Sequence, residues 1–389
     1  MAKRKYIPWI GLALCALVLP IVAQSQWSGE GSHSEKKNTF IYSPYIDVVG
    51  RPLYKFDENV EASGTKHYTL AFIVAPDRST CKPSWGGYKG YGIGTYLSDR
   101  IEALRAKGGD VTISFGGGRG EYLAGSCGDG SQASHVVALK NAYKKVVDGY
   151  QLTRIDFDIE GSWLYGHHAL WTIPLRSKAL AMLQAELGHE KLAIWYSLPV
   201  VPSGLTRAGL KAVRLAKEAG MNLTGVNLLA MDFGESNAPH PATKMGDYVN
   251  RCAASVFKQL KLIFPEKEDN AIWGMIGLTP MIGVNDATAE VFTLADAKQL
   301  RDYANKTGLG WVAMWSGNRD RACHTLSTHY VSGNCSDVHQ KMFAFQRILN
   351  GLAEPADVMI NASDILVRPM HSRHHKHVKK HMSPKAHDK

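Results

Sequence analysis

A single (β/α)8 barrel is the fold that this 389-residue sequence predicts, and the prediction depends on three observations. Eight β-rich runs alternate with helical patterns between Phe40 and Leu352. Most of these runs are almost continuously apolar, which is typical of parallel strands that are buried on both faces. The alternating region covers about 310 residues, which suits a barrel of ~250 residues with lengthened loops.

Each expected strand is a short run rich in β-branched, aromatic and aliphatic residues. Helical spacing between the runs predicts the intervening helices, and Thr293 followed by Asp296 indicates a helix start. Only the connection from the first strand to the second lacks a clear long helix. The runs begin at Phe40, Tyr68, Val111, Arg154, Leu192, Gly225, Ile272 and Gly310.

An open doubly wound sheet is the alternative arrangement of the same elements. Such a sheet usually carries a Gly-rich phosphate-binding loop after its first strand. This sequence has Ser43-Pro44-Tyr45 at that place, which favours the barrel.

Residues 1–23 have the three parts of a secretory signal peptide. Lys3-Arg4-Lys5 supply the charge, residues 9–19 form the apolar run, and residues 21–23 form a small-residue cleavage site. The run is shorter than the ~18 residues of a membrane span, so we expect cleavage and export, with an uncleaved anchor as the alternative. A leader over 24–39, one barrel domain over 40–352 and a disordered His/Lys-rich tail over 353–389 complete the expected organisation. The tail could instead bind a transition metal or an anionic surface.

Composition and charge exclude several classes of protein. Hydrophobic residues make up 45% of the chain and charged residues 21%, which is ordinary for a globular protein and excludes a disordered or collagen-like chain. The formal net charge is +10, but residues 3–5 contribute three of these charges and the tail from His371 onward a net five. Because the part between is nearly neutral, we expect no nucleic-acid partner for the folded domain.

Export makes the cysteines candidates for disulfides. Five cysteines remain after the signal peptide, so at least one thiol must stay free. Cys323 and Cys335 bracket a short loop and could pair locally, while Cys81 and Cys127 follow two expected strands and could tie their loops together. Cys252 lies in a helical pattern, and we expect it to be a buried free thiol. The spacing contains no CxxC pair and therefore predicts no zinc ribbon.

The fourth expected strand ends in alternating carboxylates. Asp156, Asp158 and Glu160 share one face of this strand, because successive side chains point to opposite faces. The other face is apolar and suits packing against outer helices, so the carboxylates point into the mouth of the barrel, where active sites of this fold lie. Crowded carboxyl groups separate in pKa, and one can remain a proton donor while a neighbour is ionised. An amphipathic edge strand and a calcium or magnesium site are the alternatives.

Four motifs make the sequence resemble glycoside hydrolase family 18, the chitinases. Residues 154–161, RIDFDIEG, resemble the family's D-x-x-D-x-D-x-E signature, whose first Asp is replaced here by Thr153. Residues 114–117, SFGG, resemble its S-x-G-G motif. Residues 227–232, NLLAMD, resemble its sixth-strand motif, and Trp315 lies where the family keeps a Trp at the end of strand eight. The four motifs fall in this order on expected strands three, four, six and eight.

The resemblance implies a substrate-assisted glycosidase, in which the N-acetyl oxygen of the substrate attacks the anomeric carbon. Glu160 would protonate the glycosidic oxygen and later activate water. Asp158 would orient the acetamido N–H and stabilise the oxazolinium ion, and Asp156 and Ser114 would support Asp158 from beneath. A positive charge that develops beside an ionised Asp is stabilised most in the transition state.

The resemblance also implies substrate contacts. Asp232 would contact the acetamido group, and Trp315 would form the apolar floor under the distorted sugar. Met231 is a departure, since many members of the family have at this position a Tyr that hydrogen-bonds the acetamido oxygen.

Aromatic residues follow the second and fourth expected strands. The first of these loops holds Trp85, Tyr88 and Tyr91, and the second holds Trp163, Tyr165 and Trp171. Sugar rings stack on aromatic faces, so these side chains are candidate substrate contacts, with Trp85 and Trp163 placed first. The alternative is that they cover an edge of the core.

The sequence therefore predicts a secreted, monomeric, retaining chitinase that binds chitin or its oligosaccharides and uses no metal or cofactor. The connection from about Gly283 to Gly310 holds one helix, and the open cleft that follows from this short connection predicts endo-type cleavage. An endo-β-N-acetylglucosaminidase that acts on N-glycans is the alternative enzyme. A carbohydrate-binding lectin on the same barrel is the alternative of another class, but such proteins typically lack the acid that Glu160 provides.

Overall fold

A computed structural model describes residues 39–323 and 331–352. The expected signal peptide, nearly all of the expected leader and the His/Lys-rich tail lie outside these ranges. Within them, no helix combines the length and the apolar character that crossing a membrane would require.

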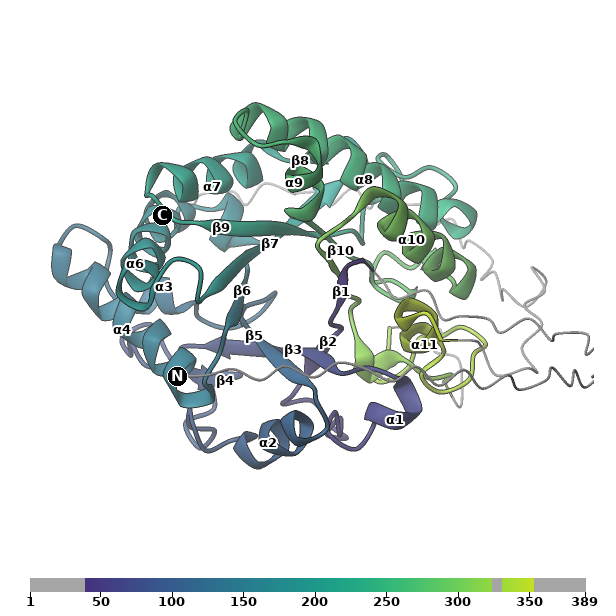
Figure 1. The fold of residues 1–389 in the computed structure, drawn as a ribbon, viewed down its shortest axis with the longest axis horizontal. Helices are drawn as coiled ribbons and strands as arrows, with labels where there is room; N and C mark the ends of the chain where they lie inside the picture. The colour runs from purple at the N-terminus through teal and green to yellow at the C-terminus, as the bar shows by residue number, and fades with distance from the viewer. Residues whose placement is uncertain (1–38, 324–330, 353–389) are drawn as a thin grey trace, which may run out of the picture. The chain divides into compact units, whose positions relative to one another are not determined.

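Parallel strands surrounded by helices form the fold, as the sequence predicts (Figure 1). Neighbouring strands pair in the order β1-β13-β10-β9-β7-β6-β5-β3-β2, and every step is parallel. These strands are β1 (Ile41–Tyr42), β2 (Tyr45–Asp47), β3 (His67–Val74), β5 (Asp110–Gly116), β6 (Arg154–Asp158), β7 (Ala193–Val201), β9 (Leu223–Leu229), β10 (Ile276–Thr279) and β13 (Trp311–Val312).

The first expected run closes the ring because it is divided into two halves. Ile41 in β1 pairs with Trp311 in β13, whereas Tyr45 in β2 pairs with Thr69 in β3. The N–H of Ser43, between the halves, donates to the carbonyl oxygen of residue 312 at 3.0 Å. β1 and β2 therefore act as one barrel strand, and the ring has eight strand positions, which excludes the open sheet.

Helices cover the outside of the ring (Figure 1). The first connection holds only the four-residue α1, as expected, and α10 begins with the predicted capping box of Thr293 and Asp296. The helices are α1 (Val60–Ser63), α2 (Ser98–Ala106), α3 (Leu123–Ser126), α4 (Ala133–Tyr150), α5 (Ser162–Tyr165), α6 (Ala169–Leu187), α7 (Arg207–Glu218), α8 (Pro241–Ile263), α9 (Asp269–Gly274), α10 (Leu294–Thr307), α11 (Ala344–Asn350) and the 3-10 turn η1 (Gly317–Arg319).

The seventh expected run differs from the structure at its start. Residues 272–274 belong to α9 rather than to a strand, and β10 begins only at Ile276. Trp273 stacks on Phe257 of α8 with ring centroids 4.4 Å apart. An apolar run that packs against a neighbouring helix has the same composition as a buried strand, so the pattern alone could not separate the two.

Four short strands extend the loops at the carboxyl ends of the barrel strands. β4 (Ser84–Trp85) pairs with β3, β8 (Gly204–Leu205) pairs with β7, and β11 (Gly283–Val284) pairs with β12 (Val291–Phe292). The connection between β10 and β13 thus holds the β11–β12 hairpin as well as the predicted helix.

Aromatic rings fill part of the inside of the barrel. Tyr45, Trp195 and Trp311 belong to one buried cluster, with centroid distances of 5.9 Å for Tyr45 and Trp311 and 5.3 Å for Trp195 and Trp311. A larger apolar core lies between the strands and the helices. The inside of the barrel is therefore packed, and the reactive groups are placed above a rigid base.

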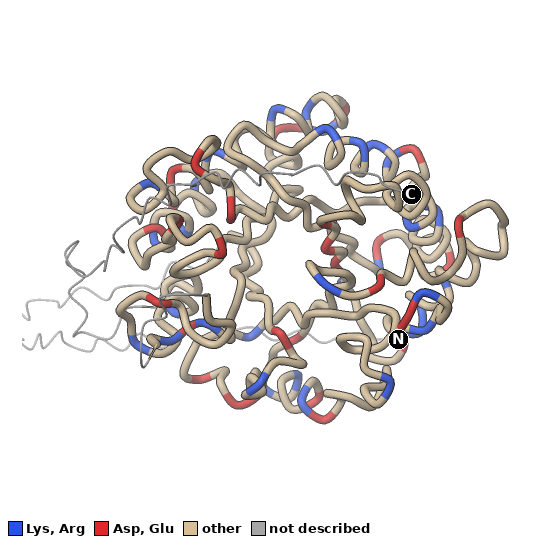
Figure 2. The backbone as a smooth tube through the Cα atoms, turned by 180° about the vertical axis from the view of Figure 1, so that it is seen from behind, with Lys and Arg blue, Asp and Glu red and all other residues tan. Residues whose placement is uncertain are grey.

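The cysteines pair as the sequence predicts. Cys81 bonds to Cys127, Cys323 bonds to Cys335, and Cys252 is a buried free thiol on α8. Basic and acidic residues are interspersed over the outer helices (Figure 2), in agreement with a nearly neutral folded domain.

Candidate active site

A cavity of about 970 Å³ opens at the carboxyl ends of the barrel strands. Asp158 and Glu160 reach it from the end of β6, Met231 and Asp232 from the end of β9, and Trp315 from the end of β13. Five residues that the sequence singled out on three separate strands therefore line one space.

Asp156 and Ser114 lie beneath this cavity and are completely buried. The carboxylate of Asp156 accepts hydrogen bonds from three hydroxyl groups, those of Ser114 at 2.6 Å, Ser197 at 2.7 Å and Tyr45 at 2.8 Å. Burial raises the pKa of Asp156 to about 6, and the three hydroxyls oppose that rise. Ser114 thus acts on a neighbouring carboxylate and does not face the cavity directly.

A further layer of hydrogen bonds orients these hydroxyls. The Asn227 amide nitrogen donates to the hydroxyl oxygens of both Ser197, at 2.9 Å, and Tyr45, at 3.2 Å. The Thr279 hydroxyl donates to the Asn227 amide oxygen at 2.8 Å. Because both hydroxyl oxygens receive a proton from Asn227, their own protons are directed at Asp156. This network favours the ionised form of Asp156.

The pKa values of Asp158 and Glu160 are both raised above the usual range of a carboxyl group. Burial, followed by the charges of Glu160 and Asp156, raises the pKa of Asp158 well above its usual range. The Oδ1 atom of Asp158 is buried and lacks a hydrogen-bond partner among the described residues. Burial and the charge of Asp232 also raise the pKa of Glu160. The arrangement places a carboxyl group with a raised pKa, that of Glu160, at the cavity end of a row of three carboxyl groups, which suits general acid catalysis.

The β11–β12 hairpin holds Asp232. The N–H of Ala287 in the hairpin donates to Asp232 Oδ1 at 2.7 Å, and the carboxylate of Glu290 accepts from Gly234 N–H at 2.7 Å. Asp232 has a φ of 51°, a conformation that needs support from its surroundings in a residue other than Gly. The hairpin supplies that support, and burial raises the pKa of Asp232.

Arg319 lines the cavity from η1 but is only 1% exposed. Its guanidinium donates to the carbonyl oxygens of Ile282 at 3.0 Å and Val284 at 2.7 Å, and to that of Ser332. Burial lowers its pKa to about 10, against the opposing effect of nearby carboxylates that include Asp232. Arg319 therefore anchors the hairpin and remains a cation beside an acidic cavity.

Trp315 forms part of an aromatic wall. Phe72 stacks on Trp315 with centroids 5.8 Å apart, and both rings line the cavity. Tyr45 lies 6.3 Å from the Trp315 ring. Such a wall presents an apolar face to a sugar ring.

Two of the six candidate loop aromatics line the cavity. Tyr88 and Tyr165 do so, with 56% and 53% of their surfaces exposed. Trp85 is fully buried, and its indole N–H donates to the Tyr150 hydroxyl at 2.8 Å. Trp163 stacks on another loop ring instead of facing the cavity. The structure therefore assigns Trp85 and Trp163 to core edges, because their loops fold back on the outer layer.

Sequence reasoning missed several residues that support the site, namely Tyr45, Ser197, Thr279 and Arg319. Ser197 and Thr279 share one signal, a small hydroxyl residue inside a largely apolar strand run, whereas the run that holds Tyr45 contains several other polar groups. A polar residue at such a position must find a partner inside the barrel, since burial without one is costly. Arg319 has no comparable signal, because it lies in a loop of mixed composition.

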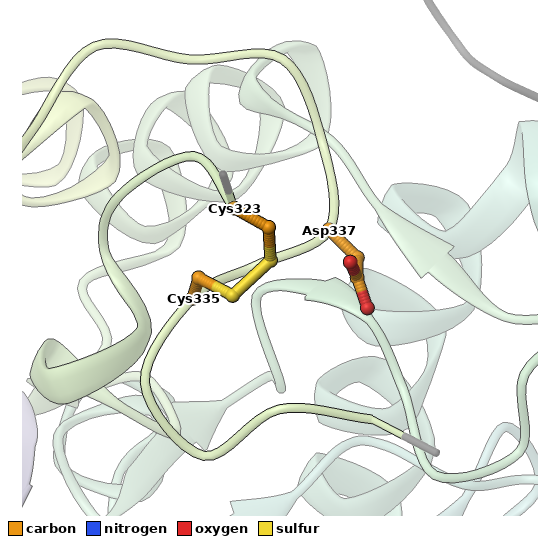
Figure 3. Close-up of side chains that lie close together, drawn as sticks. All are labelled: Cys323, Cys335 and Asp337. Carbon is orange, nitrogen blue, oxygen red and sulfur yellow. A yellow bond between two sulfur atoms is a disulfide. The ribbon is translucent and has the colours of Figure 1, made fainter. Parts of the chain in front are cut away.

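One cluster of metal-ligand residue types occurs among the described residues, and it lies in the loop after η1 (Figure 3). Cys323, Cys335 and Asp337 have ligand atoms within 4.8 Å of one another. The two sulfur atoms are joined in a disulfide, however, so no thiolate is present to bind a metal. This cluster therefore offers a single carboxylate and is a structural crosslink.

Carboxyl groups above an aromatic wall, at the carboxyl ends of a (β/α)8 barrel, define a glycosidase-type site. No protein-family model matches the chain. Among solved structures, the catalytic domain of a hyperthermophilic chitinase from Pyrococcus furiosus is 33% identical, with a TM-score of 0.68 over 80% of this chain and 95% of that one. Catalytic-site mutants of active domain 2 of a thermostable chitinase from Pyrococcus furiosus, complexed with chito-oligosaccharides, are also 33% identical. Their TM-score is 0.67, over 80% of this chain and 95% of that one. This chain belongs to the glycoside hydrolase family 18 chitinases.

Two curated proteins are similar over 72% of this chain. A probable bifunctional chitinase/lysozyme of Escherichia coli (strain K12) is 38% identical over 287 residues, and Endochitinase 11 of Metarhizium anisopliae is 36% identical over 288 residues. The matched segments cover 31% and 52% of those proteins. This chain thus spans about a third to a half of the length of these relatives.

Proposed function

We propose that this protein hydrolyses β-1,4 bonds in chitin or its oligosaccharides, with retention of configuration and without a metal ion. The observation that carries the proposal is the joint placement of Glu160, Asp158 and Asp232 on one cavity of a family 18 barrel. The complex of a similar chitinase domain with chito-oligosaccharides supports this class of substrate.

In the first step, the Glu160 carboxyl group gives its proton to the glycosidic oxygen as the bond from that oxygen to the anomeric carbon breaks. The carbonyl oxygen of the substrate's acetamido group forms the new bond to that carbon, which yields an oxazolinium ion. Asp158 accepts the acetamido N–H and stabilises the positive charge. In the second step, the Glu160 carboxylate takes a proton from water as the water opens the oxazolinium ring, so configuration is retained.

We further propose endo-type cleavage by an exported enzyme. The two disulfides fit an oxidising compartment, and the expected signal over residues 1–23 and the barrel domain over 40–352 belong to the same proposal. Endo-type cleavage predicts a rapid fall in the viscosity of a soluble chitin derivative while few reducing ends appear. An exo-acting enzyme would release reducing sugar with little change in viscosity.

Hydrolysis of 4-nitrophenyl N,N′-diacetylchitobioside and of colloidal chitin tests the function directly. The parent protein should release product, Glu160→Gln should lose at least about a hundredfold in rate, and a chelator should have no effect. Glu218→Gln is the matched control, because Glu218 is exposed on α7 and this substitution makes the same chemical change. Proton NMR of the first product should show the β-anomer.

Other outcomes lead to the alternatives. Equal rates in the parent and Glu160→Gln would remove Glu160 from its role. Binding to chitin without hydrolysis by the parent would indicate a lectin. Release of N-glycans from a glycoprotein without hydrolysis of chitin would indicate an endo-β-N-acetylglucosaminidase.

A further inference from the structure

Tyr122 joins the ends of two barrel strands next to the proposed acid. Its hydroxyl oxygen lies 2.9 Å from the carbonyl oxygen of Gly117 and 2.8 Å from that of Asp158, and the N–H of Glu160 donates to it at 3.3 Å. A phenol has one proton, so it donates to one carbonyl at a time while it accepts from Glu160. One side chain thus holds the backbone on both sides of residue 159.

The Tyr122 ring is fixed by its neighbours. Trp163 stacks on it with centroids 4.7 Å apart and planes 10° from parallel. The Arg176 guanidinium carbon lies 5.7 Å from the ring centroid, a cation–π distance. Tyr122 is only 3% exposed, so its hydroxyl has little freedom to move away from the strand ends.

The segment that carries Tyr122 is also tied to a second loop. The N–H of Ala75 donates to the carbonyl oxygen of Glu121 at 2.7 Å, directly before Tyr122. Five residues after Tyr122, Cys127 forms the disulfide with Cys81. These two links hold the backbone of Tyr122 from both directions.

Glu160 lies where the support of the sheet ends. The last hydrogen bond from this strand to β7 is donated by Ile159 N–H to the carbonyl oxygen of Ser197 at 2.9 Å. The next N–H, that of Glu160, donates to Tyr122 instead. A general acid that is displaced by about 1 Å loses much of its effect, so a hydrogen bond at this position bears on catalysis.

We propose that Tyr122 is a positioning residue, which holds the backbone of Glu160 so that its carboxyl group meets the glycosidic oxygen. The proposal rests on the function given above for Glu160. It predicts a selective defect, because a misplaced acid matters most where the leaving group needs a proton. A chitin oligosaccharide leaves as an alkoxide unless it is protonated, whereas 4-nitrophenol leaves readily as the phenolate.

The test compares kcat/KM for chitotetraose and for 4-nitrophenyl N,N′-diacetylchitobioside in Tyr122→Phe. The Phe ring keeps the contacts with Trp163 and Arg176 and removes only the hydroxyl. We expect kcat/KM for chitotetraose to fall about tenfold and that for the aryl glycoside to fall less than about twofold. Trp163→Leu, which loosens the ring but keeps the hydroxyl, should show the same selectivity to a smaller degree.

Tyr68→Phe is the matched control, since Tyr68 is completely buried and its hydroxyl oxygen lies 3.2 Å from that of Ser63, apart from the residues that contact Tyr122. It should behave as the parent on both substrates. Equal losses on both substrates in Tyr122→Phe, or no loss on either, would overturn the positioning role. If Glu160→Gln also kept full activity, the proposed function itself would have failed, and the two failures are therefore distinguishable.

Discussion

Removing either serine hydroxyl that donates to Asp156 should move the acidic limb of the pH–activity profile upward. Ser114 and Ser197 donate to this buried carboxylate at 2.6 and 2.7 Å. A hydrogen bond to a charged group contributes about 1.5–3 kcal/mol, and one pKa unit corresponds to about 1.36 kcal/mol. Each Ser→Ala substitution should therefore raise the pKa of Asp156 from about 6 by about one to two units.

The assay is kcat/KM for the chromogenic chitobioside between pH 4 and 9. We assign the acidic limb to the ionisation of Asp156 in the free enzyme. Ser43→Ala is the matched control, because the Ser43 hydroxyl is buried 3.0 Å from that of Thr69. An acidic limb at the parent position in both Ser114→Ala and Ser197→Ala would refute the assignment of the limb to Asp156.

Three other perturbations test the structure. Burial raises the pKa of Asp320 to about 6, above the ~3.9 of an unfolded chain. Its contribution to the free energy of unfolding is therefore complete below pH 4 and is lost as the pH rises through 6. The loss amounts to roughly 3 kcal/mol. Asp156, whose pKa is also raised to about 6, contributes a similar decline, so urea unfolding of Asp320→Asn should show a decline between pH 4 and 8 that is smaller than that of the parent by this amount. A decline equal to that of the parent would contradict the assignment. Replacing Cys81 and Cys127 by Ser opens a link between residues 46 apart and should cost about 4 kcal/mol in the same assay; a loss below about 1 kcal/mol would count against that estimate. Gly116 has a φ of +101°, and a Cβ there would lie 2.2 Å from a β6 carbonyl oxygen. Gly116→Ala should therefore lower the free energy of unfolding by more than about 2 kcal/mol. Gly118→Ala is the control and should be tolerated, because a Cβ at Gly118 meets nothing closer than 3.4 Å.

The barrel could be predicted from the sequence because each strand is a local pattern. Eight apolar runs and the helical spacing between them specify eight parallel strand positions without reference to long-range contacts. The error at Ile272 has the opposite cause. Whether an apolar run pairs with a strand or packs on a helix depends on a partner elsewhere in the chain, here Phe257 of α8.

The residues that face the cavity were predictable in part. Asp158 and Glu160 follow from strand alternation, and Asp232 and Trp315 follow from motifs that lie at strand ends. Trp85, in contrast, has the same local appearance as a cavity aromatic. Its burial against Tyr150 depends on how the β3–β4 loop folds back, which neither composition nor spacing encodes.

The layer beneath the cavity could not be read from any one segment, since its members come from different strands. Tyr45 belongs to β2, Ser197 to β7, Asn227 to β9 and Thr279 to β10. Their hydrogen bonds form one chain, from Thr279 through Asn227 to the hydroxyls that donate to Asp156, and this chain exists only when the ring is closed. Closure of the barrel therefore also brings together the hydroxyl groups that oppose the rise in the pKa of the buried Asp156.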